Sequence, residues 1–348
     1  NYYLSIEKNY ENNEEFLRAG VILFSYLLDK ENLKKVIKKI FDSNIESKFL
    51  RGNAIFENNY YNEWSQLDHL NFATNNSKYF SKLKTKNLDQ INYKVNNKIN
   101  LGFISPDFER NHSTTFFLKD TIKYLNKDKF KIFLFSIAKK NDNDQSQNEL
   151  RILSDVWYDL NDCNNQKIAK LIQQERINIL VDLMGYTRPE RLELFHSRIA
   201  PKQVSWLAYC NTSGVDEMDF LIVDNNLILN SEEKFYSEKI IKLPYIWNSH
   251  SGFGDPRKLN ELPSLNNEVF TFGSLNNFRK ISDDVVESWS KILQAVPNSK
   301  LILKSSTPCD NGSLLKKFKK FKTDHKVEIL KKFDFVKKHD HLKVYNRI

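Results

Sequence analysis

Two runs of alternating strand and helix patterns, separated by a polar stretch, constrain the fold of this chain more than any other feature. In the first run, short apolar segments alternate with helical spacing of apolar residues from Ile99 onward. Strands are predicted at 99–104, 131–135, 177–183, 203–207 and 219–223, and helices near 114–126, 164–175 and 190–197. Parallel strands need long connections, so this alternation predicts a parallel sheet with crossover helices. We expect a Rossmann-like domain over residues 96–255, with Thr114 and Thr115 as candidate helix caps.

The alternation restarts after a polar stretch at about residues 248–267, which contains several glycines and prolines and is interpreted as a linker. Strands are then predicted at 269–272, 300–303 and 327–330, and helices near 283–295, 313–321 and 336–346. A second Rossmann-like domain is therefore expected over residues 266–348. It has only three predicted strands, whereas such a domain usually has about five or six. We expect this domain to be incomplete and the chain to be a fragment.

Residues 1–95 are predicted to be all helical. Apolar residues recur at helical spacing from Phe16 to Tyr26 and again from Leu33 to Ile40. The similar segments 16–20 and 49–52 lie 33 residues apart, near the ~34-residue period of tetratricopeptide (TPR) repeats. Two copies leave two interpretations open, a degenerate repeat and a plain helical linker.

The composition argues for a globular protein with a basic surface. The hydrophobic fraction of 40% is sufficient for more than one core, and the net charge of +9 comes from lysines spread along the whole chain. We therefore expect a solvated lysine-rich surface and no nucleic-acid partner, with nucleotide phosphate or an acidic protein as the alternative anionic partner. The densest lysine run, at 316–322, is interpreted as an exposed helix face.

Cysteine usage and hydropathy bear on the compartment. The chain has three cysteines, Cys163, Cys210 and Cys309, which lie far apart and lack the spacing of metal ligands. No apolar run reaches the ~18 residues that a membrane span needs. We expect a cytoplasmic protein without a membrane partner, although the chain begins at Asn1 and a targeting segment could precede it.

Polar residues gather at the first strand-to-helix turn of each predicted domain, where open parallel sheets bind ligands. The turn at 105–114 carries a carboxylate, a guanidinium, an amide and an imidazole before its helix begins. The alternative interpretation is structural, with Asp107 and Ser113 as caps and His112 on the surface. If the turn is functional, Asp107 and His112 are its candidate chemical groups.

The second turn, at 273–280, is less specific. Gly273 would let the backbone approach a ligand closely, and Lys280 near a helix N-terminus would supply positive charge for a diphosphate. Ser282 and Asp283 are candidate caps of the following helix, and a lone exposed lysine is the structural alternative. Tandem domains of this kind are typical of metal-independent glycosyltransferases, and nearly as typical of periplasmic-type binding proteins and some epimerases. The acidic triplet at 142–144 is interpreted as a loop, and no metal site is expected.

Several short motifs in order resemble the catalytic region of the O-linked N-acetylglucosamine (O-GlcNAc) transferases, from about residue 99 to the end of the chain. They are Leu101–Phe108 with His112, Ile179–Thr187, Arg198–Leu207, Thr212–Gly214, Tyr236–Lys239 with Leu243 and Pro244, Gly273–Asn277 with Lys280, and Val296–Ser299.

The resemblance implies a fold and a set of site residues. The fold is α/β of GT-B type, with uridine diphosphate (UDP) bound on the C-terminal domain and TPR repeats before the catalytic region. Lys280 would stabilise the diphosphate leaving group, and Asn277, Lys338 and His341 would contact the nucleotide. His112 and Asp107 match the pair debated as base or substrate positioner. Thr114, Leu207 and Ala208 would lie near the sugar.

The implied reaction is an inverting, metal-independent transfer of N-acetylglucosamine from UDP-GlcNAc to Ser or Thr hydroxyls of a protein, without a cofactor. A lysine and helix amides would stabilise the charge that develops on the diphosphate. The hydroxyl proton would go to a neutral His112 or to a donor phosphate oxygen. Protein glucosyltransferases that act on Asn, and a non-catalytic binding module, are the alternatives.

Three departures from the family pattern qualify this resemblance. Three residues instead of two separate Phe108 from His112, so His112 is expected to be displaced. The segment Tyr209–Asn211 lacks the proline that the family has beside the sugar site. The donor-binding Gly-Thr-Thr loop that follows in the family is not found before Ile348, so the chain as given is expected to be inactive.

Overall fold

The computed structural model describes most of the chain and groups it into two compact units. The described residues are 2–7, 10, 12–43, 45–61, 64–85, 88, 91, 97–109, 112–187, 191–250, 252, 260–266, 268–304, 311–330 and 340–348. Unit 1 contains residues 1–45, 57–63 and 256–348, and unit 2 contains residues 46–56 and 64–255. The predicted domain boundaries at residues 95, 255 and 266 remain predictions.

The N-terminal region is helical, as predicted. Its helices are α1 (Tyr2–Ile6), α2 (Glu14–Leu27), α3 (Lys30–Asp42), α4 (Lys48–Asn58), α5 (Gln66–Phe80) and the 3₁₀ helix η2 (Ser81–Leu83). The apolar stripe of α3 from Leu33 to Ile40 is buried, which the spacing had indicated. In α2 the buried side chains are instead those of Leu17, Val21 and Phe24, and Ile22 remains exposed.

Unit 2 is built on a seven-stranded parallel sheet with the strand order β3-β2-β1-β4-β5-β6-β7. The strands are β1 (Ile99–Ser105), β2 (Phe130–Ser136), β3 (Val156–Asp159), β4 (Ile179–Asp182), β5 (Lys202–Ser205), β6 (Phe220–Asp224) and β7 (Lys239–Leu243). The five predicted strands are present, most with shifted ends. The two strands that the sequence pattern did not predict, β3 and β7, form the edges of the sheet.

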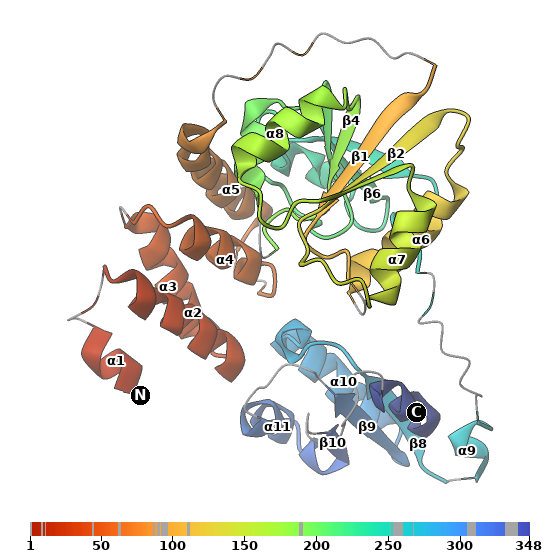
Figure 1. Cartoon of the computed structure of the whole chain (residues 1–348). Helices are drawn as coiled ribbons and strands as arrows, with labels where there is room; N and C mark the ends of the chain where they lie inside the picture. Colours follow the sequence, from red (N-terminus) through yellow and green to blue (C-terminus); the bar gives the residue numbers. More distant parts are fainter. Residues whose placement is uncertain are drawn as a thin grey trace. The chain divides into compact units, whose positions relative to one another are not determined.

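Helices cover both faces of this sheet (Figure 1). They are α6 (Ser113–Tyr124), α7 (Gln145–Leu153), α8 (Asn165–Gln174), and the 3₁₀ helices η3 (Leu192–Ser197) and η4 (Asn230–Phe235). Because crossovers are right-handed, the reversal of strand order after β3 places α8 on the face opposite α6 and α7. Leu118 of α6 and Leu150 of α7 share a core with Phe103 and Val181 of the sheet. The helix predicted at 190–197 is the 3₁₀ helix η3.

Unit 1 contains a three-stranded parallel sheet with the order β10-β9-β8. Its strands are β8 (Phe270–Ser274), β9 (Ser299–Lys304) and β10 (Val327–Leu330), and its further helices are α9 (Pro263–Asn266), η5 (Phe278–Lys280), α10 (Asp283–Ala295), α11 (Asn311–Lys319), η6 (Asp324–Lys326) and η8 (Asp340–Arg347). Leu28, which follows α2, packs into the same core as Phe278 and Leu303. The N-terminal helices α1 to α3 therefore belong to the unit that contains this sheet.

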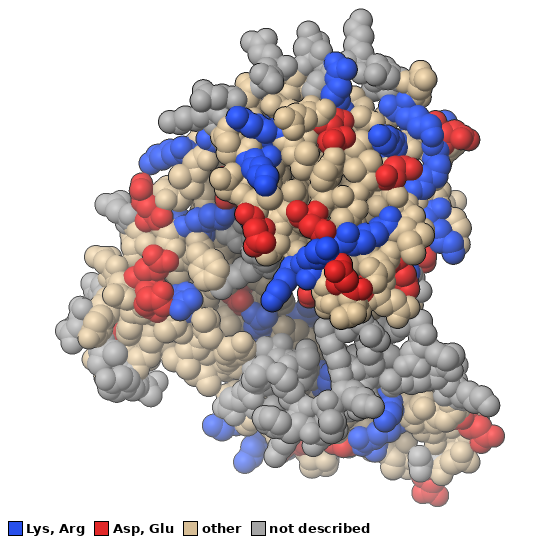
Figure 2. All heavy atoms as spheres, viewed as in Figure 1, with Lys and Arg blue, Asp and Glu red and all other residues tan. Residues whose placement is uncertain are grey.

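The surface in Figure 2 carries Lys and Arg side chains interspersed with Asp and Glu side chains. Several lysines form ion pairs, for example Lys119 with Glu149 and Lys317 with Asp283. Within the ranges that the structure describes, no helix is both long and apolar enough to cross a membrane.

Candidate active site

The first group of predicted site residues lies at the carboxyl end of β1 in unit 2. Strand β1 lies between β2 and β4, so the chain order of the sheet reverses beside it. Crevices at such reversals are the usual ligand sites of open parallel sheets. Asp107 and His112 follow β1 directly, before α6 begins.

Asp107 is held firmly and is largely removed from water. Its backbone N–H donates to Oγ of Ser105 at 3.0 Å, and its carbonyl accepts from Oγ1 of Thr115 at 2.7 Å. The residue is 8% exposed. Burial, reinforced by the negative charge of Glu109 and opposed by a hydrogen bond from Thr114, raises the pKa of Asp107 to about 7. A carboxyl group with this pKa can both accept and release a proton near neutral pH.

His112 is the N-cap of α6, so Thr114 and Thr115, which were the predicted caps, lie inside the helix. Its Nδ1 accepts a hydrogen bond from the N–H of Thr114 at 3.4 Å, and its Nε2 lies 3.5 Å from Oδ1 of Asp107. His112 thus has a structural role as the N-cap, which the alternative assigned to Asp107 and Ser113, and it also lies next to the Asp107 carboxylate. The additional residue before His112 does not prevent it from reaching Asp107.

The predicted sugar-side residues take up strained or buried positions. Leu207 follows β5 with a φ angle of 80°, which non-glycine residues rarely adopt. The N–H of Ala208 donates to the carbonyl of Trp206 at 3.0 Å, which closes a three-residue turn around Leu207. Thr114 is buried in the first turn of α6. Strain of this kind is often found at ligand sites, because the surrounding structure must hold it in place.

Asp182, at the end of β4, is a residue that the sequence analysis did not single out. Its carboxylate is fully buried and accepts from the N–H groups of Met184 and Gly185, both at 2.9 Å. Burial raises the pKa of Asp182 to about 6, against the opposing effect of these two hydrogen bonds. The carboxylate of Asp182 thereby fixes the loop that follows β4, the strand next to β1. The sequence signal that could have indicated Asp182 was an acidic residue at the end of an apolar run.

Glu238 is a second residue without a predicted role. It is buried and accepts hydrogen bonds from Oγ1 of Thr212 at 2.8 Å, from N of Ser213 at 2.7 Å and from the hydroxyl groups of Ser213 and Ser237. The same loop contains Gly214 with a φ of 70°, and a Cβ added there would lie 2.3 Å from the backbone carbon of Ala73. Glu238 thus stabilises the loop that follows the proline-free segment 209–211.

The second group of predicted residues lies after β8 in unit 1. Asn277 is the N-cap of η5, because its Oδ1 accepts from N of Arg279 at 3.1 Å. Lys280 is exposed, and among the residues that the structure describes it forms no ion pair. Ser282 is the N-cap of α10, in agreement with the prediction, and the N-terminus of α10 follows Lys280 directly. A cation beside a helix N-terminus is suited to a phosphate group.

The role predicted for Gly273, a close approach of the backbone to a ligand, stays a prediction. The side chain of Ile348 lies against Gly273, and a Cβ added at Gly273 would come within 2.1 Å of Ile348. Lys338 lies outside the described residues, and His341 is part of η8. Lys304, which was not predicted as a site residue, lies at the carboxyl end of β9 beside β8, and burial lowers its pKa.

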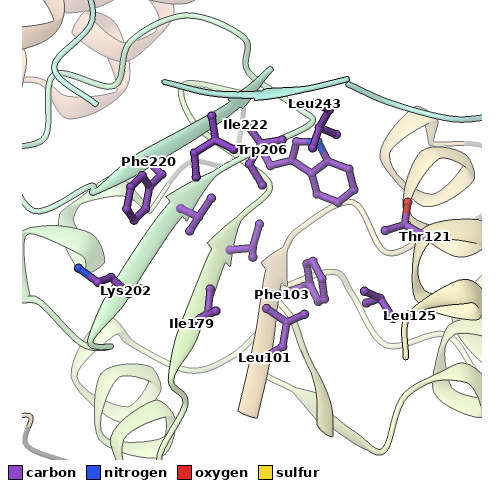
Figure 3. A pocket seen from close by; sticks show the side chains of 13 residues that line it. Leu101, Phe103, Thr121, Leu125, Ile179, Lys202, Trp206, Phe220, Ile222 and Leu243 are labelled. Carbon is purple, nitrogen blue, oxygen red and sulfur yellow. The ribbon is translucent and has the colours of Figure 1, made fainter. Parts of the chain in front are cut away.

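The sheet of unit 2 has an apolar cavity of about 380 Å³ that does not contain the predicted site residues. Its lining comes from alternate positions of β1 and β4 to β7, among them Leu101, Phe103, Ile179 and Ile222, with Leu125, which follows α6 (Figure 3). Apart from Lys202 and Thr121, the lining side chains are hydrophobic. Such a lining lacks the donors that a diphosphate needs.

The comparison with family models decides the classification. The model of glycosyl transferase family 41 matches residues 68–259. This range covers more than half of the chain, including Asp107, His112 and Glu238. The chain belongs to glycosyl transferase family 41. The resemblance seen in the sequence is thereby confirmed at the level of the family.

The family 41 relatives include plant proteins. The chain is 32% identical over 213 residues to the probable UDP-N-acetylglucosamine–peptide N-acetylglucosaminyltransferase SPINDLY of Arabidopsis thaliana, a match that covers 61% of this chain and 23% of the relative. It is 30% identical over 276 residues to the protein of the same name from Hordeum vulgare, covering 77% of this chain and 29% of the relative. The chain thus spans about a quarter of the length of these relatives.

A solved structure confirms the GT-B type of fold. The chain matches a mutant O-GlcNAc transferase from Thermobaculum terrenum with a TM-score of 0.77 and 22% identity, over 96% of this chain and 66% of that chain. Within the described ranges, no group of three or more His, Cys, Asp or Glu side chains is arranged to hold a metal ion.

Proposed function

We propose that the protein is an inverting glycosyltransferase that moves N-acetylglucosamine from UDP-GlcNAc to Ser or Thr hydroxyls of proteins, without a metal ion or a cofactor. The observation that carries the proposal is the buried Asp107 in contact with His112 at the strand reversal of a family 41 domain. The names of the SPINDLY relatives, which specify UDP-N-acetylglucosamine and a peptide acceptor, support the choice of substrates.

The hydrogen-bond geometry favours Asp107 over His112 as the group that accepts the hydroxyl proton. Nδ1 of His112 already accepts from the N–H of Thr114, so the neutral imidazole carries its proton on Nε2, which faces Asp107. This tautomer has no unoccupied acceptor nitrogen. Asp107, with a pKa of about 7, is half ionised at neutral pH. We assign Asp107 as the base and His112 as the donor that orients it.

Lys280 and the N-terminus of α10 would stabilise the diphosphate leaving group. Negative charge develops on the diphosphate as the bond to the sugar breaks, and a cation with helix N–H groups stabilises that charge. Ser282 caps only part of the first turn of α10, because its Oγ accepts from N of Val285. Asn277, Lys338 and His341 are proposed nucleotide contacts, and Thr114, Leu207 and Ala208 are proposed sugar contacts.

Lys280→Ala tests the assignment of the donor site. In steady-state transfer by the gene product that carries this sequence, we expect kcat to fall by about 10²-fold or more, with a smaller change in KM. Lys291→Ala, which removes an exposed lysine paired with Glu287 in α10, is the matched control. Equal kcat for Lys280→Ala and Lys291→Ala would exclude Lys280 from the reaction. We further propose a cytoplasmic location, which the three widely separated cysteines of the sequence support, because their number and spacing do not suggest a disulfide framework.

A further inference from the structure

A buried ion pair connects the last turn of α4 to the turn that carries Lys280. Nη1 of Arg279 lies 2.5 Å from Oε1 of Glu57, although the two residues are 222 positions apart in the sequence. The other carboxylate oxygen of Glu57 accepts from Oγ of Ser25 in α2 at 3.0 Å. Both oxygens of the Glu57 carboxylate thus have protein partners. Glu57 is only 7% exposed, so these contacts are largely shielded from water. All three residues belong to unit 1.

Arg279 is fixed by more than this charge pair. Its guanidinium carbon lies 4.5 Å from the ring centre of Tyr60, within the range of a cation–π interaction. Burial alone would lower the pKa of Arg279, but the carboxylate of Glu57 reverses this effect and raises it, so the guanidinium remains charged. One carboxylate and one aromatic ring therefore set the position of this side chain.

The residues on either side of Arg279 and Lys280 are also anchored. Phe278 and Ile281 are buried in the core of unit 1, where they pack with Leu28 from the C-terminal end of α2. Among residues 278–281, Lys280 is the one whose side chain is exposed to solvent. The exposed ammonium group thus stands on a backbone turn that two apolar contacts and one ion pair hold in place.

A buried ion pair is a poor choice if stability is all that is required. Desolvation of the two charges offsets most of their attraction, and apolar residues of similar size are often equally stable. What the pair provides is a defined direction, because Nη1 of Arg279 meets one oxygen of a carboxylate whose other oxygen is held by Ser25.

We infer that Glu57 and Arg279 are positioning residues for the donor diphosphate, and that they hold the η5 turn so that Lys280 meets the phosphates. The inference rests on the proposed function, in which Lys280 binds the diphosphate. A turn that is already ordered loses less entropy when the ligand binds, so the pair should increase affinity for the diphosphate. The helices that precede the catalytic region then contribute to donor binding through α4.

The ratio of the affinities for UDP and uridine tests this inference. Uridine lacks the diphosphate, so a change confined to the phosphate site alters the UDP dissociation constant and leaves that of uridine unchanged. Two variants are compared with the unmodified protein by titration calorimetry or ligand-observed NMR, Glu57→Ala and the double variant Glu57→Ala/Arg279→Leu. The double variant removes both charges and should recover the unfolding temperature that Glu57→Ala loses.

We expect the ratio of the uridine to the UDP dissociation constant to fall about tenfold in both variants. Glu7→Gln, which removes the charge of the Lys39–Glu7 ion pair in the same unit, should leave the ratio unchanged. A double variant with recovered stability and an unchanged ratio would show that the pair is only structural. If the double variant does not fold, Arg279→Lys, which keeps the charge but not the planar guanidinium that contacts Glu57 and Tyr60, must lower the ratio. An unmodified protein that binds UDP no better than uridine would overturn the proposed role of Lys280 itself, and this inference with it.

Discussion

Asp107 determines how this protein should respond to pH. Its pKa is raised in the folded state from 3.8 to about 7, so the native state binds a proton that the unfolded chain has released. The stability that this proton contributes is complete below about pH 4 and is lost as the pH rises toward about 7. Asp182, with a pKa raised to about 6, acts in the same direction.

Asp107→Asn should therefore change the pH dependence of stability. Relative to the unmodified protein, the variant should gain up to about 4 kcal/mol between pH 4 and pH 8, because asparagine has no charge to desolvate. Denaturant titrations at both pH values measure this difference. The same variant should have little transfer activity at any pH. A stability difference that does not vary with pH would contradict the raised pKa.

Glu238 is the residue on which the 212–214 loop depends. Glu238→Ala leaves several buried donors unpaired and should reduce the free energy of unfolding by about 2–4 kcal/mol. Glu238→Gln keeps two acceptor lone pairs on one oxygen and should cost less than Glu238→Ala. Chemical denaturation of the three proteins distinguishes these cases. A loss of less than about 0.5 kcal/mol for Glu238→Ala would show that water replaces the carboxylate.

At the scale of elements, the N-terminus of α10 is capped by Ser282 and is also the proposed phosphate-binding end of the helix. Ser282→Ala removes the N-cap and should destabilise the protein by about 1 kcal/mol, whereas Ser282→Asp should restore the cap. Thermal or denaturant unfolding measures both variants. If the helix N-terminus also binds phosphate, added UDP should stabilise the unmodified protein more than Ser282→Asp, because a carboxylate beside the phosphate repels it. Equal stabilisation of the unmodified protein and Ser282→Asp by UDP would show that the N-terminus of α10 is not part of the donor site.

The elements that the sequence predicted correctly are those with strong periodic patterns. Strands β1 and β2 end in continuous buried runs, and α10 has an apolar stripe with Ser282 before it. The edge strands β3 and β7 were missed because they are short and only partly buried, so their sequences have no continuous apolar run. The helix α7 was not predicted because it lies in a polar stretch of the sequence. Its N-cap is Asp144, which belongs to the triplet 142–144 that was interpreted as a loop.

The candidate site was predictable only in part, because some of its contacts join residues that are far apart in the sequence. Asp107, His112 and Lys280 were identifiable because polar residues follow apolar strands. The capping role of His112 could not be predicted, because histidine is not a usual N-cap. The contact of Glu57 with Arg279 joins residues that are 222 positions apart. Nothing in a local pattern indicates such a pair, since it depends on tertiary packing.

At the scale of the whole molecule, we expect catalysis that does not depend on a metal ion. In the proposed mechanism, Lys280 and the N-terminus of α10 would perform the task that a divalent cation performs in other transferases. Addition of EDTA to the transfer reaction should leave the rate within about twofold of that without chelator. A rate that disappears with EDTA and returns with Mg²⁺ or Mn²⁺ would contradict this part of the proposal.

The proposed transfer of N-acetylglucosamine to protein hydroxyl groups can be tested with labelled donor. The gene product that carries this sequence is incubated with UDP-GlcNAc labelled in the sugar and with a mixture of proteins, and the label is located by mass spectrometry with fragmentation that keeps the sugar attached. We expect label on Ser and Thr, and none when Asp107→Asn replaces the unmodified protein. Label on Asn, or UDP binding with no transfer of the sugar to any protein, would contradict this expectation.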